Sequence, residues 1–177
     1  IFVGSLAEND SFGSPYSTSK HICGELGTMI SNREKINFAH IKLATLYGPY
    51  DDEKHVIPMT IKKLLKEEVV LLSNGTQSWD YIYTEDAARA LVLLAGKSGI
   101  YEVGTGQSTK VRDVIDMIVS EIPGQIIYDE YTSIGEQIKI ADPSKLYTET
   151  GWKPMVTLKN GLKETIEYYK EFDESVR

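Results

Sequence analysis

The stretch "SPYSTSKHICGE" (residues 14–25) has the features of a helix start. Ser14 is a residue type that caps helices, and Pro15 suits the first helical position because proline lacks the N–H group that the first turn leaves unbonded. We therefore predict a helix over residues 15–32. Tyr16 and Lys20 are four positions apart, so they share one face of this helix.

The pattern around this helix is typical of an α/β protein, because short apolar runs alternate with longer amphipathic ones. The chain opens on "IFVG" (1–4), which indicates a buried strand. A domain rarely begins on its own central strand, so we expect the chain to be the later part of a longer protein. Further strands are predicted at 38–48, 69–72, 79–83, 100–104, 125–129 and 137–141, and further helices at 56–68, 84–96, 110–122, 142–151 and 158–172.

Composition narrows the classes of protein to consider. Hydrophobic residues make up 41% of the 177 residues and charged residues 25%, as in a globular protein. The net charge of −7 argues against binding to nucleic acid. Cys23 is the only cysteine, which excludes an internal disulfide and favours a reducing compartment. The sequence has neither a membrane span of roughly 20 apolar residues nor a signal-peptide pattern, so the expected location is the cytoplasm. No metal site is predicted, because the three histidines and Cys23 lack ligand spacing.

The spacing of Tyr16 and Lys20 suits acid–base chemistry. A phenol with an ordinary pKa of about 10 is a weak acid–base catalyst at neutral pH. An ammonium group beside a phenol stabilises the phenolate, which can then exchange a proton with a sugar hydroxyl or carbonyl while a hydride moves. Such a lysine is also long enough to reach the ribose of a nicotinamide cofactor. The same spacing arises by chance in many helices, and the pair is then an ordinary aromatic residue and a surface charge.

Ser5 favours the catalytic interpretation of that pair. It directly follows the strand at 1–4, at the carboxyl end where α/β sheets place their ligands. A serine hydroxyl at this position can hydrogen-bond the same substrate oxygen that Tyr16 protonates.

This order of motifs, strand–Ser, Tyr-x-x-x-Lys and a strand ending in Tyr-Gly-Pro, resembles the extended short-chain dehydrogenase/reductase family. Its members include the NAD-dependent nucleotide-sugar epimerases, 4,6-dehydratases and 4-ketoreductases. The resemblance continues through "LATLYGPYDDEKHVIP" (43–58), "NGTQSWDYIYTEDAARAL" (74–91), "GIYEVGTGQSTKVRDVIDMI" (99–118) and "ADPSKLYTETGWKPMVTLKNGLKETIEYY" (141–169). Several motifs in the family's order make the match specific.

The resemblance implies a fold and a division into domains. The fold would be α/β, the later part of a Rossmann-type doubly wound parallel sheet with a smaller mixed α/β substrate-binding domain. Residues 1–50 would belong to the dinucleotide-binding domain and residues 51–177 to the substrate-binding domain. The segment 79–104 is a candidate to cross back to the Rossmann sheet.

The resemblance also implies roles for individual residues. Ser5, Tyr16 and Lys20 would be the catalytic triad, with Tyr16 as the acid and base and Lys20 on the cofactor ribose. The cofactor would be NAD or NADP, bound by Tyr16, Lys20 and Leu43, with the strand end at Leu43 against the nicotinamide. The expected contacts to a nucleotide-sugar substrate are Ser5, Thr45, His55, Val56 and Trp79.

Departures from the family pattern bear on the activity. The chain lacks the glycine turn G-x-x-G-x-x-G that holds a cofactor pyrophosphate. "GTGQST" (104–109) matches a later loop of the family instead, and a G-x-G with two glycines is more often a plain turn. Leu6 and Ala7 follow Ser5 where dehydratases carry Asp-Glu, which disfavours dehydration. Trp79 stands where many relatives have an arginine on the nucleotide phosphates. An indole can stack on a base or sugar but cannot neutralise a diphosphate.

We therefore predict an NAD(P)-dependent nucleotide-sugar epimerase that acts by transient hydride transfer. A 4-ketoreductase of a nucleotide-linked sugar is the alternative enzyme, because it shares the triad and differs only in whether the hydride returns to the same molecule. A non-catalytic family member, used as a binding or regulatory module, is the alternative of another class. A homodimer is a further expectation, since the helix at 15–32 carries Ile22, Leu26, Met29 and Ile30, although burial within the monomer explains the same pattern.

Overall fold

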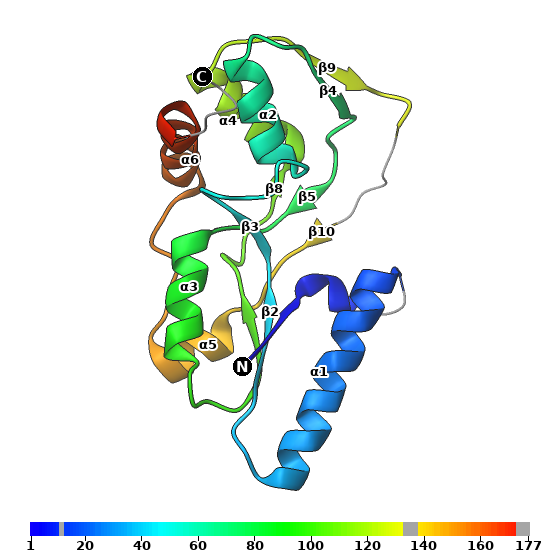
Figure 1. Cartoon of the computed structure of the whole chain (residues 1–177), viewed down its shortest axis with the longest axis vertical. Helices are drawn as coiled ribbons and strands as arrows, with labels where there is room; N and C mark the ends of the chain where they lie inside the picture. Colours follow the sequence, from blue (N-terminus) through cyan, green and yellow to red (C-terminus); the bar gives the residue numbers. More distant parts are fainter. Residues whose placement is uncertain (11–12, 133–137, 173–177) are drawn as a thin grey trace. The chain divides into compact units, whose positions relative to one another are not determined.

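The computed structural model of the chain describes residues 1–10, 13–132 and 138–172 (Figure 1). The chain divides into two compact units that are each built from three segments. Unit 1 consists of Ile1–Leu46, Asp80–Gln107 and Lys139–Met155, and unit 2 of Tyr47–Trp79, Ser108–Ile138 and Val156–Arg177. The helices in the described ranges are too short or too polar to cross a bilayer.

Helices and strands alternate along the chain, which confirms the predicted α/β class (Figure 1). The described helices are η1 (Leu6–Asn9, a 3-10 helix), α1 (Pro15–Glu34), α2 (Val56–Leu65), α3 (Thr84–Leu93), α4 (Val111–Glu121), α5 (Ser144–Thr150) and α6 (Leu158–Phe172). The described strands are β1 (Phe2–Ser5), β2 (Ala39–Leu43), β3 (Thr45–Tyr47), β4 (Val70–Ser73), β5 (Ser78–Trp79), β6 (Tyr81–Tyr83), β7 (Gly99–Val103), β8 (Thr109–Lys110), β9 (Ile126–Asp129) and β10 (Ile138–Lys139).

The sheet of unit 1 is parallel and has the strand order β1-β2-β7. Its register places Ser5 beside Leu43 and Leu43 beside Val103. The carboxyl ends of all three strands therefore lie at one edge of the sheet, which is the edge where parallel sheets bind ligands.

Helix α1 begins at the residue that its sequence predicts and ends two residues later than predicted. Ser14 caps it, because the Ser14 side chain accepts a hydrogen bond from the Ser17 N–H at 3.1 Å, and Pro15 is the first helical residue. At the other end Lys35 adopts a left-handed conformation (φ 55°) that stops the helix. The observed helix is two residues longer than the predicted range of 15–32.

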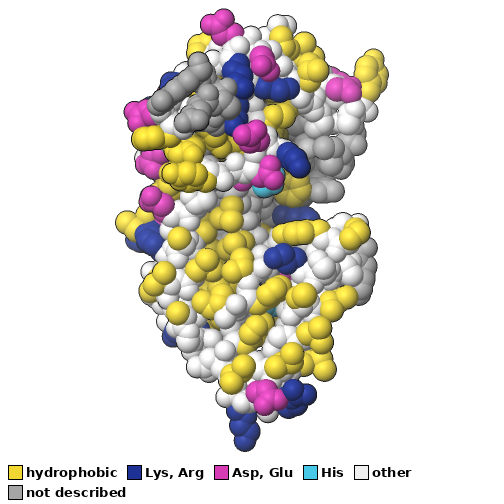
Figure 2. Space-filling model, viewed as in Figure 1, with side chains coloured by type: hydrophobic (Ala, Val, Ile, Leu, Met, Phe, Trp, Pro, Cys, Tyr) yellow, Lys and Arg dark blue, Asp and Glu magenta, His cyan; other side chains and the backbone are white. Residues whose placement is uncertain are grey.

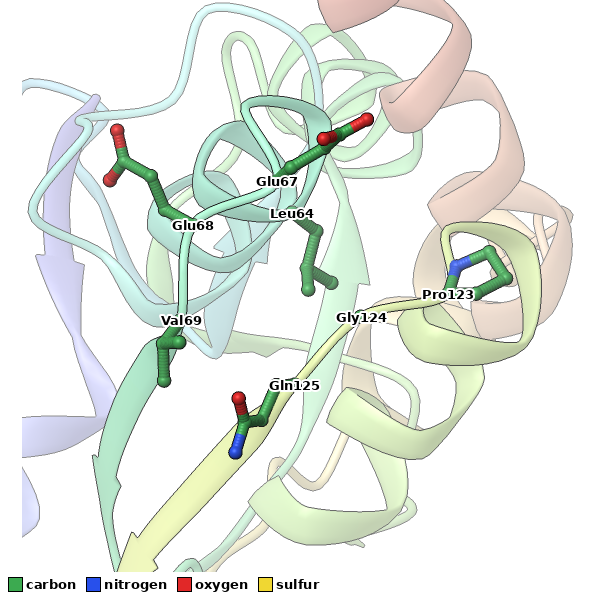
Figure 3. Close-up of a pocket in the computed structure, with 7 residues that line it drawn as sticks. All are labelled: Leu64, Glu67, Glu68, Val69, Pro123, Gly124 and Gln125. Atoms are coloured by element: carbon green, nitrogen blue, oxygen red, sulfur yellow. The ribbon is translucent and has the colours of Figure 1, made fainter.

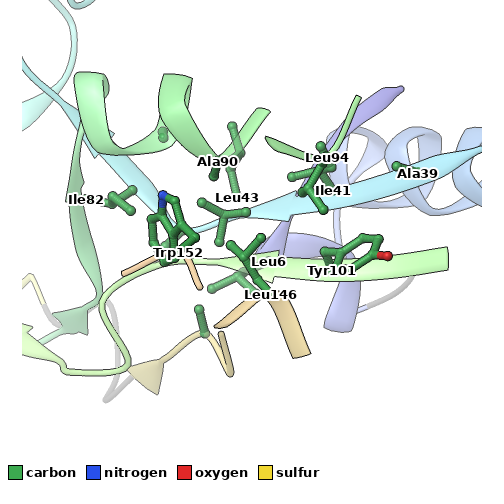
Figure 4. Close-up of a cluster of buried hydrophobic side chains, with 14 residues drawn as sticks. Leu6, Ala39, Ile41, Leu43, Ile82, Ala90, Leu94, Tyr101, Leu146 and Trp152 are labelled. Carbon is green, nitrogen blue, oxygen red and sulfur yellow. The ribbon is translucent and has the colours of Figure 1, made fainter. Parts of the chain in front are cut away.

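One face of the parallel sheet is covered by α3 and α5 through an apolar cluster (Figure 4). Ile41 of β2 is fully buried in this cluster, and the indole N–H of Trp152 donates to the Asp86 carbonyl at 3.0 Å. The cluster consists of Leu6, Ala39, Ile41, Leu43, Ala44, Ile82, Ala87, Ala90, Leu94, Tyr101, Val103, Ala141, Leu146 and Trp152. Helix α1 packs against β1 and β2 from the other face of the sheet.

Unit 2 is built around three helices that pack on one another, α2, α4 and α6. Their buried side chains include Ile61, Ile115 and Ile166. Strands β4 and β9 form a parallel pair in the same unit.

Two predicted strands are each split into two shorter ones. The strand predicted at 38–48 breaks at Ala44, because the Ala44 N–H donates to Val103 O at 2.8 Å while the next N–H, that of Thr45, donates to Asp80 O at 2.9 Å. The strand predicted at 79–83 breaks at Asp80, whose side chain is buried and accepts hydrogen bonds from another loop. In both places the chain changes its hydrogen-bonding partner, which an apolar run cannot reveal.

Candidate functional site

Ser5 is the last residue of β1 and the cap of η1. Its hydroxyl oxygen accepts a hydrogen bond from the Ala7 N–H at 3.2 Å, and its own N–H donates to Glu8 Oε1 at 2.8 Å. A hydroxyl has one hydrogen to donate as well as two lone pairs. The Ala7 contact therefore orients the Ser5 hydroxyl and leaves its hydrogen available to a bound oxygen atom.

Tyr16 and Lys20 share a face of α1 as predicted, and Lys20 also reaches β1. Its Nζ atom donates to Val3 O at 2.8 Å and lies 5.9 Å from the centre of the Tyr16 ring. The Tyr16 side chain is accessible, since the residue is 55% exposed. Lys20 therefore ties the start of α1 to the strand that ends in Ser5 and places a positive charge beside the Tyr16 ring.

Leu43 and Thr45 lie at the same edge of the sheet. Leu43 pairs in register with Ser5, and its side chain packs into the apolar cluster of unit 1 (Figure 4). Thr45 follows at the start of β3 with an exposed side chain. The structure thus brings Leu43 beside Ser5 and leaves the Thr45 hydroxyl accessible from solvent.

The loop after β7 that contains "GTG" does not offer its amides to a phosphate. The Thr105 and Gly106 N–H groups donate to the Asp80 carboxylate at 2.8 and 2.9 Å, and Ala141 N–H donates to it at 3.2 Å. Glycine is required at position 104, beside the Asp80 carboxylate, because an added Cβ would lie 2.5 Å from Asp80 Oδ2. This loop is a turn built around a buried carboxylate, in agreement with the plain-turn interpretation.

Sequence reasoning missed a buried polar pair beneath Ser5. Glu8 of η1 and His40 of β2 are both buried, and Glu8 Oε2 lies 2.8 Å from His40 Nε2, in contact but without the alignment of a full hydrogen bond. Burial lowers the pKa of His40, and the Glu8 charge opposes this effect only in part. The short distance from Glu8 to Ser5 along the chain was the available signal, but nothing in the sequence joins Glu8 to His40.

The remaining predicted contacts, His55, Val56 and Trp79, belong to unit 2. His55 is exposed just before α2, and its Nδ1 atom lies 2.8 Å from Asp51 Oδ1, which fixes the imidazole ring. Val56 is the half-buried first residue of α2. Trp79 is half-buried in β5, where it pairs with Thr109 of β8. These residues have accessible surface for a ligand, and their part in a common site with Ser5, Tyr16 and Lys20 stays a prediction.

A small hollow in unit 2 has none of the predicted site residues in its lining (Figure 3). It has a volume of about 150 Å³ and lies between the turn after α2 and the loop before β9. Glu67 and Glu68 are the charged residues among its lining residues, which are Leu64, Glu67, Glu68, Val69, Pro123, Gly124 and Gln125. Its size is far below the roughly 300–1,000 Å³ of typical small-molecule pockets.

The outer face of α1 is apolar. Ile22, Leu26, Met29 and Ile30 are between 46% and 66% exposed, and hydrophobic side chains gather over this helix in Figure 2. Burial within unit 1 therefore does not account for their pattern in the described part of the chain. Pairing with a second copy stays a prediction.

Comparison with known proteins identifies relatives across most of the chain. The model of the NAD dependent epimerase/dehydratase family matches residues 5–104. A protein of Methanocaldococcus jannaschii named "Putative UDP-glucose 4-epimerase" is 34% identical over 164 residues, which cover 89% of this chain and 53% of that protein. The chain spans about half the length of the curated relatives it matches.

Solved structures resemble the fold over nearly the same extent. The crystal structure of UDP-glucose 4-epimerase from Thermotoga maritima with UDP-glucose has a TM-score of 0.82 and 26% identity, over 89% of this chain and 54% of that one. The dTDP-glucose 4,6-dehydratase of Bacillus anthracis in complex with NAD has a TM-score of 0.89 over 98% of this chain and 62% of that one. Its identity of 20% makes this second likeness one of fold alone.

Proposed function

Because the chain belongs to the NAD-dependent epimerase/dehydratase family, we propose that it carries the catalytic side chains of a nucleotide-sugar epimerase that uses NAD or NADP. The observation that supports this most strongly is the tie between α1 and β1. Lys20 bonds to Val3 O and flanks the Tyr16 ring, while Ser5 ends the same strand at the carboxyl edge of the sheet. The UDP-glucose 4-epimerase of similar fold, solved with UDP-glucose, supports a nucleotide sugar as the substrate class.

The donor groups of unit 1 fit the nicotinamide ribose of the cofactor. The Lys20 ammonium has three hydrogens and uses one on Val3 O, so two remain for ribose hydroxyls. The strand end at Leu43 would lie against the nicotinamide ring. The amides of Thr105 and Gly106 are bonded to Asp80, so the pyrophosphate must be held by other groups.

The cofactor, when bound, would supply the acceptor and then the donor of a hydride for the sugar ring. In this proposal the Tyr16 phenolate takes the proton of the sugar hydroxyl as the carbon is oxidised, and returns it when the carbonyl is reduced. The Lys20 charge stabilises the phenolate, and the Ser5 hydroxyl donates a hydrogen bond to the same sugar oxygen.

Unit 2 would bind the nucleotide part of the substrate. The Trp79 indole offers a flat surface for stacking on a base or sugar, and His55, held by Asp51, offers a hydrogen-bonding ring. Val56, at the start of α2, would contact the nucleotide through its backbone. Thr45 and Ser5 would contact the sugar.

The test is a substitution of Tyr16 by Phe in the full-length protein, incubated with NAD and a panel of nucleotide sugars. Removal of a general acid–base group is expected to lower kcat by about 10²–10⁴-fold, while affinity for the cofactor changes little. Tyr147→Phe is the matched control, because Tyr147 is also an exposed tyrosine of a unit 1 helix, at 59% exposure, and should leave kcat unchanged.

This assay, run in parallel with NADH or NADPH and a keto-sugar nucleotide, separates the three functions. An epimerase interconverts two nucleotide sugars with a catalytic amount of NAD and no net reduction of it. A 4-ketoreductase consumes NADH or NADPH in equal amount with a keto-sugar nucleotide. Cofactor or sugar binding without any product, in wild type and variant alike, would contradict the enzymatic proposal and indicate a binding module.

A further inference from the structure

We propose that the buried pair Glu8–His40 is a positioning device for the triad, holding Ser5 at a fixed place relative to the helix that carries Tyr16 and Lys20. This inference rests on the proposed function and extends it to two residues outside the triad. Neither side chain reaches solvent, since the Glu8 side chain is fully buried and that of His40 is 3% exposed. Their role is therefore to act through Ser5 and α1, not to touch the substrate.

Glu8 connects Ser5 to β2 through its two carboxylate oxygens. Oε1 accepts the hydrogen bond from the Ser5 N–H at 2.8 Å, and Oε2 contacts His40 Nε2 at 2.8 Å. Ser5 is already paired in register with Leu43. The hydrogen bond to Glu8 adds a second restraint on the backbone of Ser5, and so on the position of its hydroxyl. The same engagement removes Glu8 as a replacement for the acid–base residues that dehydratases carry after this serine.

His40 sets the spacing between β1 and α1. Its ring occupies space left by two glycines: an added Cβ on Gly4 would lie 2.8 Å from Nε2, and one on Gly24 would lie 2.1 Å from Cε1. Gly4 belongs to the strand that ends in Ser5, and Gly24 belongs to the helix that carries Tyr16. The imidazole ring is thus the spacer between the two elements.

A continuous series of contacts joins this spacer to the catalytic side chains. The Phe2 ring packs on His40 at a centroid distance of 5.2 Å, and Lys20 Nζ lies 5.5 Å from the centre of the Phe2 ring. Lys20 in turn flanks Tyr16. The series therefore runs from Ser5 through Glu8, His40, Phe2 and Lys20 to Tyr16.

Stability alone gives a weak reason for such a pair. Removal of the Glu8 carboxylate and the His40 ring from water costs desolvation free energy, which offsets much of the attraction between them. The hydrogen bond from the Ser5 N–H to Glu8, in contrast, restrains the position of Ser5, and misplacement of a catalytic group by about 1 Å can cost about 10²-fold in rate.

The experiment compares Glu8→Ala and Glu8→Gln in the full-length protein with the matched control Asp86→Asn. Asp86 is also a buried carboxylate of unit 1, and it accepts the Met155 N–H at 2.9 Å and contacts Arg89, but it lies on α3 across the sheet. We expect Glu8→Ala to lower kcat about 10²-fold with little change in KM. Glu8→Gln keeps an acceptor for the Ser5 N–H and should restore most of kcat. Asp86→Asn should lower the unfolding midpoint without lowering kcat.

A second measurement reads the position of Ser5 directly. In Glu8→Ala the Ser5 amide proton should lose its protection from hydrogen exchange, and its chemical shift should change. In Glu8→Gln the same proton should keep its protection and its wild-type chemical shift. An unchanged Ser5 amide in Glu8→Ala would overturn the positioning role, and so would equal kcat values in Glu8→Ala and Asp86→Asn at matched stability.

A different result would contradict the proposed function itself. A wild-type protein without turnover on any nucleotide sugar overturns the epimerase proposal and with it the catalytic part of this inference. The Ser5 amide measurement still decides, in that case, whether Glu8 holds Ser5 in place.

Discussion

His40 and Ile41 are consecutive residues of β2 and are both buried, yet they face opposite sides of the sheet and opposite kinds of environment. Ile41 lies in the apolar cluster of unit 1, where any well-packed aliphatic side chain of its volume would serve. His40 lies between Glu8, the Phe2 ring and two glycines next to the triad, where its position sets the spacing of β1 and α1. The difference indicates that one face of the sheet mainly supplies stability and the other mainly supplies geometry.

The largest stability effect is expected on the apolar face. Ile41→Ala should lower the free energy of unfolding by about 2–5 kcal/mol, because Ile41 is fully buried and the cavity is lined by packed neighbours. Urea unfolding followed by circular dichroism measures this, and Ile41→Val, at about 0.5–1.5 kcal/mol, is the graded control. The kcat of the folded protein should remain at the wild-type value. A kcat loss as large as that of Glu8→Ala would erase the distinction between the two faces.

A smaller stability effect with a larger catalytic one is expected on the polar face. Gly24→Ala places a methyl group against the His40 ring, and overpacking of this kind costs about 1–3 kcal/mol. The higher helix propensity of alanine returns about 1 kcal/mol, so the net loss should be modest. Displacement of α1 from β1 should nevertheless lower kcat by roughly tenfold or more.

Gly27→Ala is the control for that substitution. Gly27 is on the same helix, and its added Cβ would meet the half-buried ring of Phe38 at 2.2 Å, away from Glu8 and His40. Stability should fall to a similar extent while kcat stays unchanged. Equal kcat losses in the two variants would show that α1 responds to crowding anywhere along its length.

The smallest expected effect is a pH dependence from His40. Its pKa in the folded protein is lowered by burial, so the neutral ring is favoured in the folded state. Glu8 and Glu25 favour the charged ring and Lys42 opposes it, but burial prevails. Its contribution to stability is therefore complete above the unfolded pKa of about 6.5 and is lost as pH falls below that value.

Urea unfolding measured at several pH values between about 7 and 5 tests this contribution. One group changes the free energy of unfolding by at most about 1.4 kcal/mol per pH unit, and His40→Asn should reduce the slope by part of that amount. An identical slope in His40→Asn and wild type would mean that His40 does not titrate differently on folding.

The sequence predicted the helices better than the strands. The cap at Ser14, the proline at position 15 and the apolar periodicity are local signals, and α1 begins where they place it. The strands predicted at 38–48 and 79–83 were wrong in their continuity, because Ala44 and Asp80 break them through hydrogen bonds to residues far away in the chain. An apolar run indicates that a segment is buried, but it does not indicate which strand accepts the hydrogen bond of each N–H group.

In the candidate site, too, the local features could be predicted from the sequence and the contacts between distant residues could not. The placement of Tyr16 and Lys20 on one helix face and of Ser5 at a strand end follows from spacing alone. The Glu8–His40 contact joins residues 32 positions apart, and the space for it depends on Gly4 and Gly24, whose absent side chains carry no sequence signal of their own. Such a contact requires the tertiary structure before it can be recognised.

The way in which each unit is assembled from three separate stretches has a consequence for engineering. No single cut in the backbone releases either half whole, so neither can be produced alone or transplanted onto another protein as one contiguous piece. To transfer the substrate preference of a relative by exchanging one unit, all three of its chain segments would have to be replaced together, with compatible connections at each segment end. Single-residue changes at the surface of the existing halves are the more accessible route to a new preference.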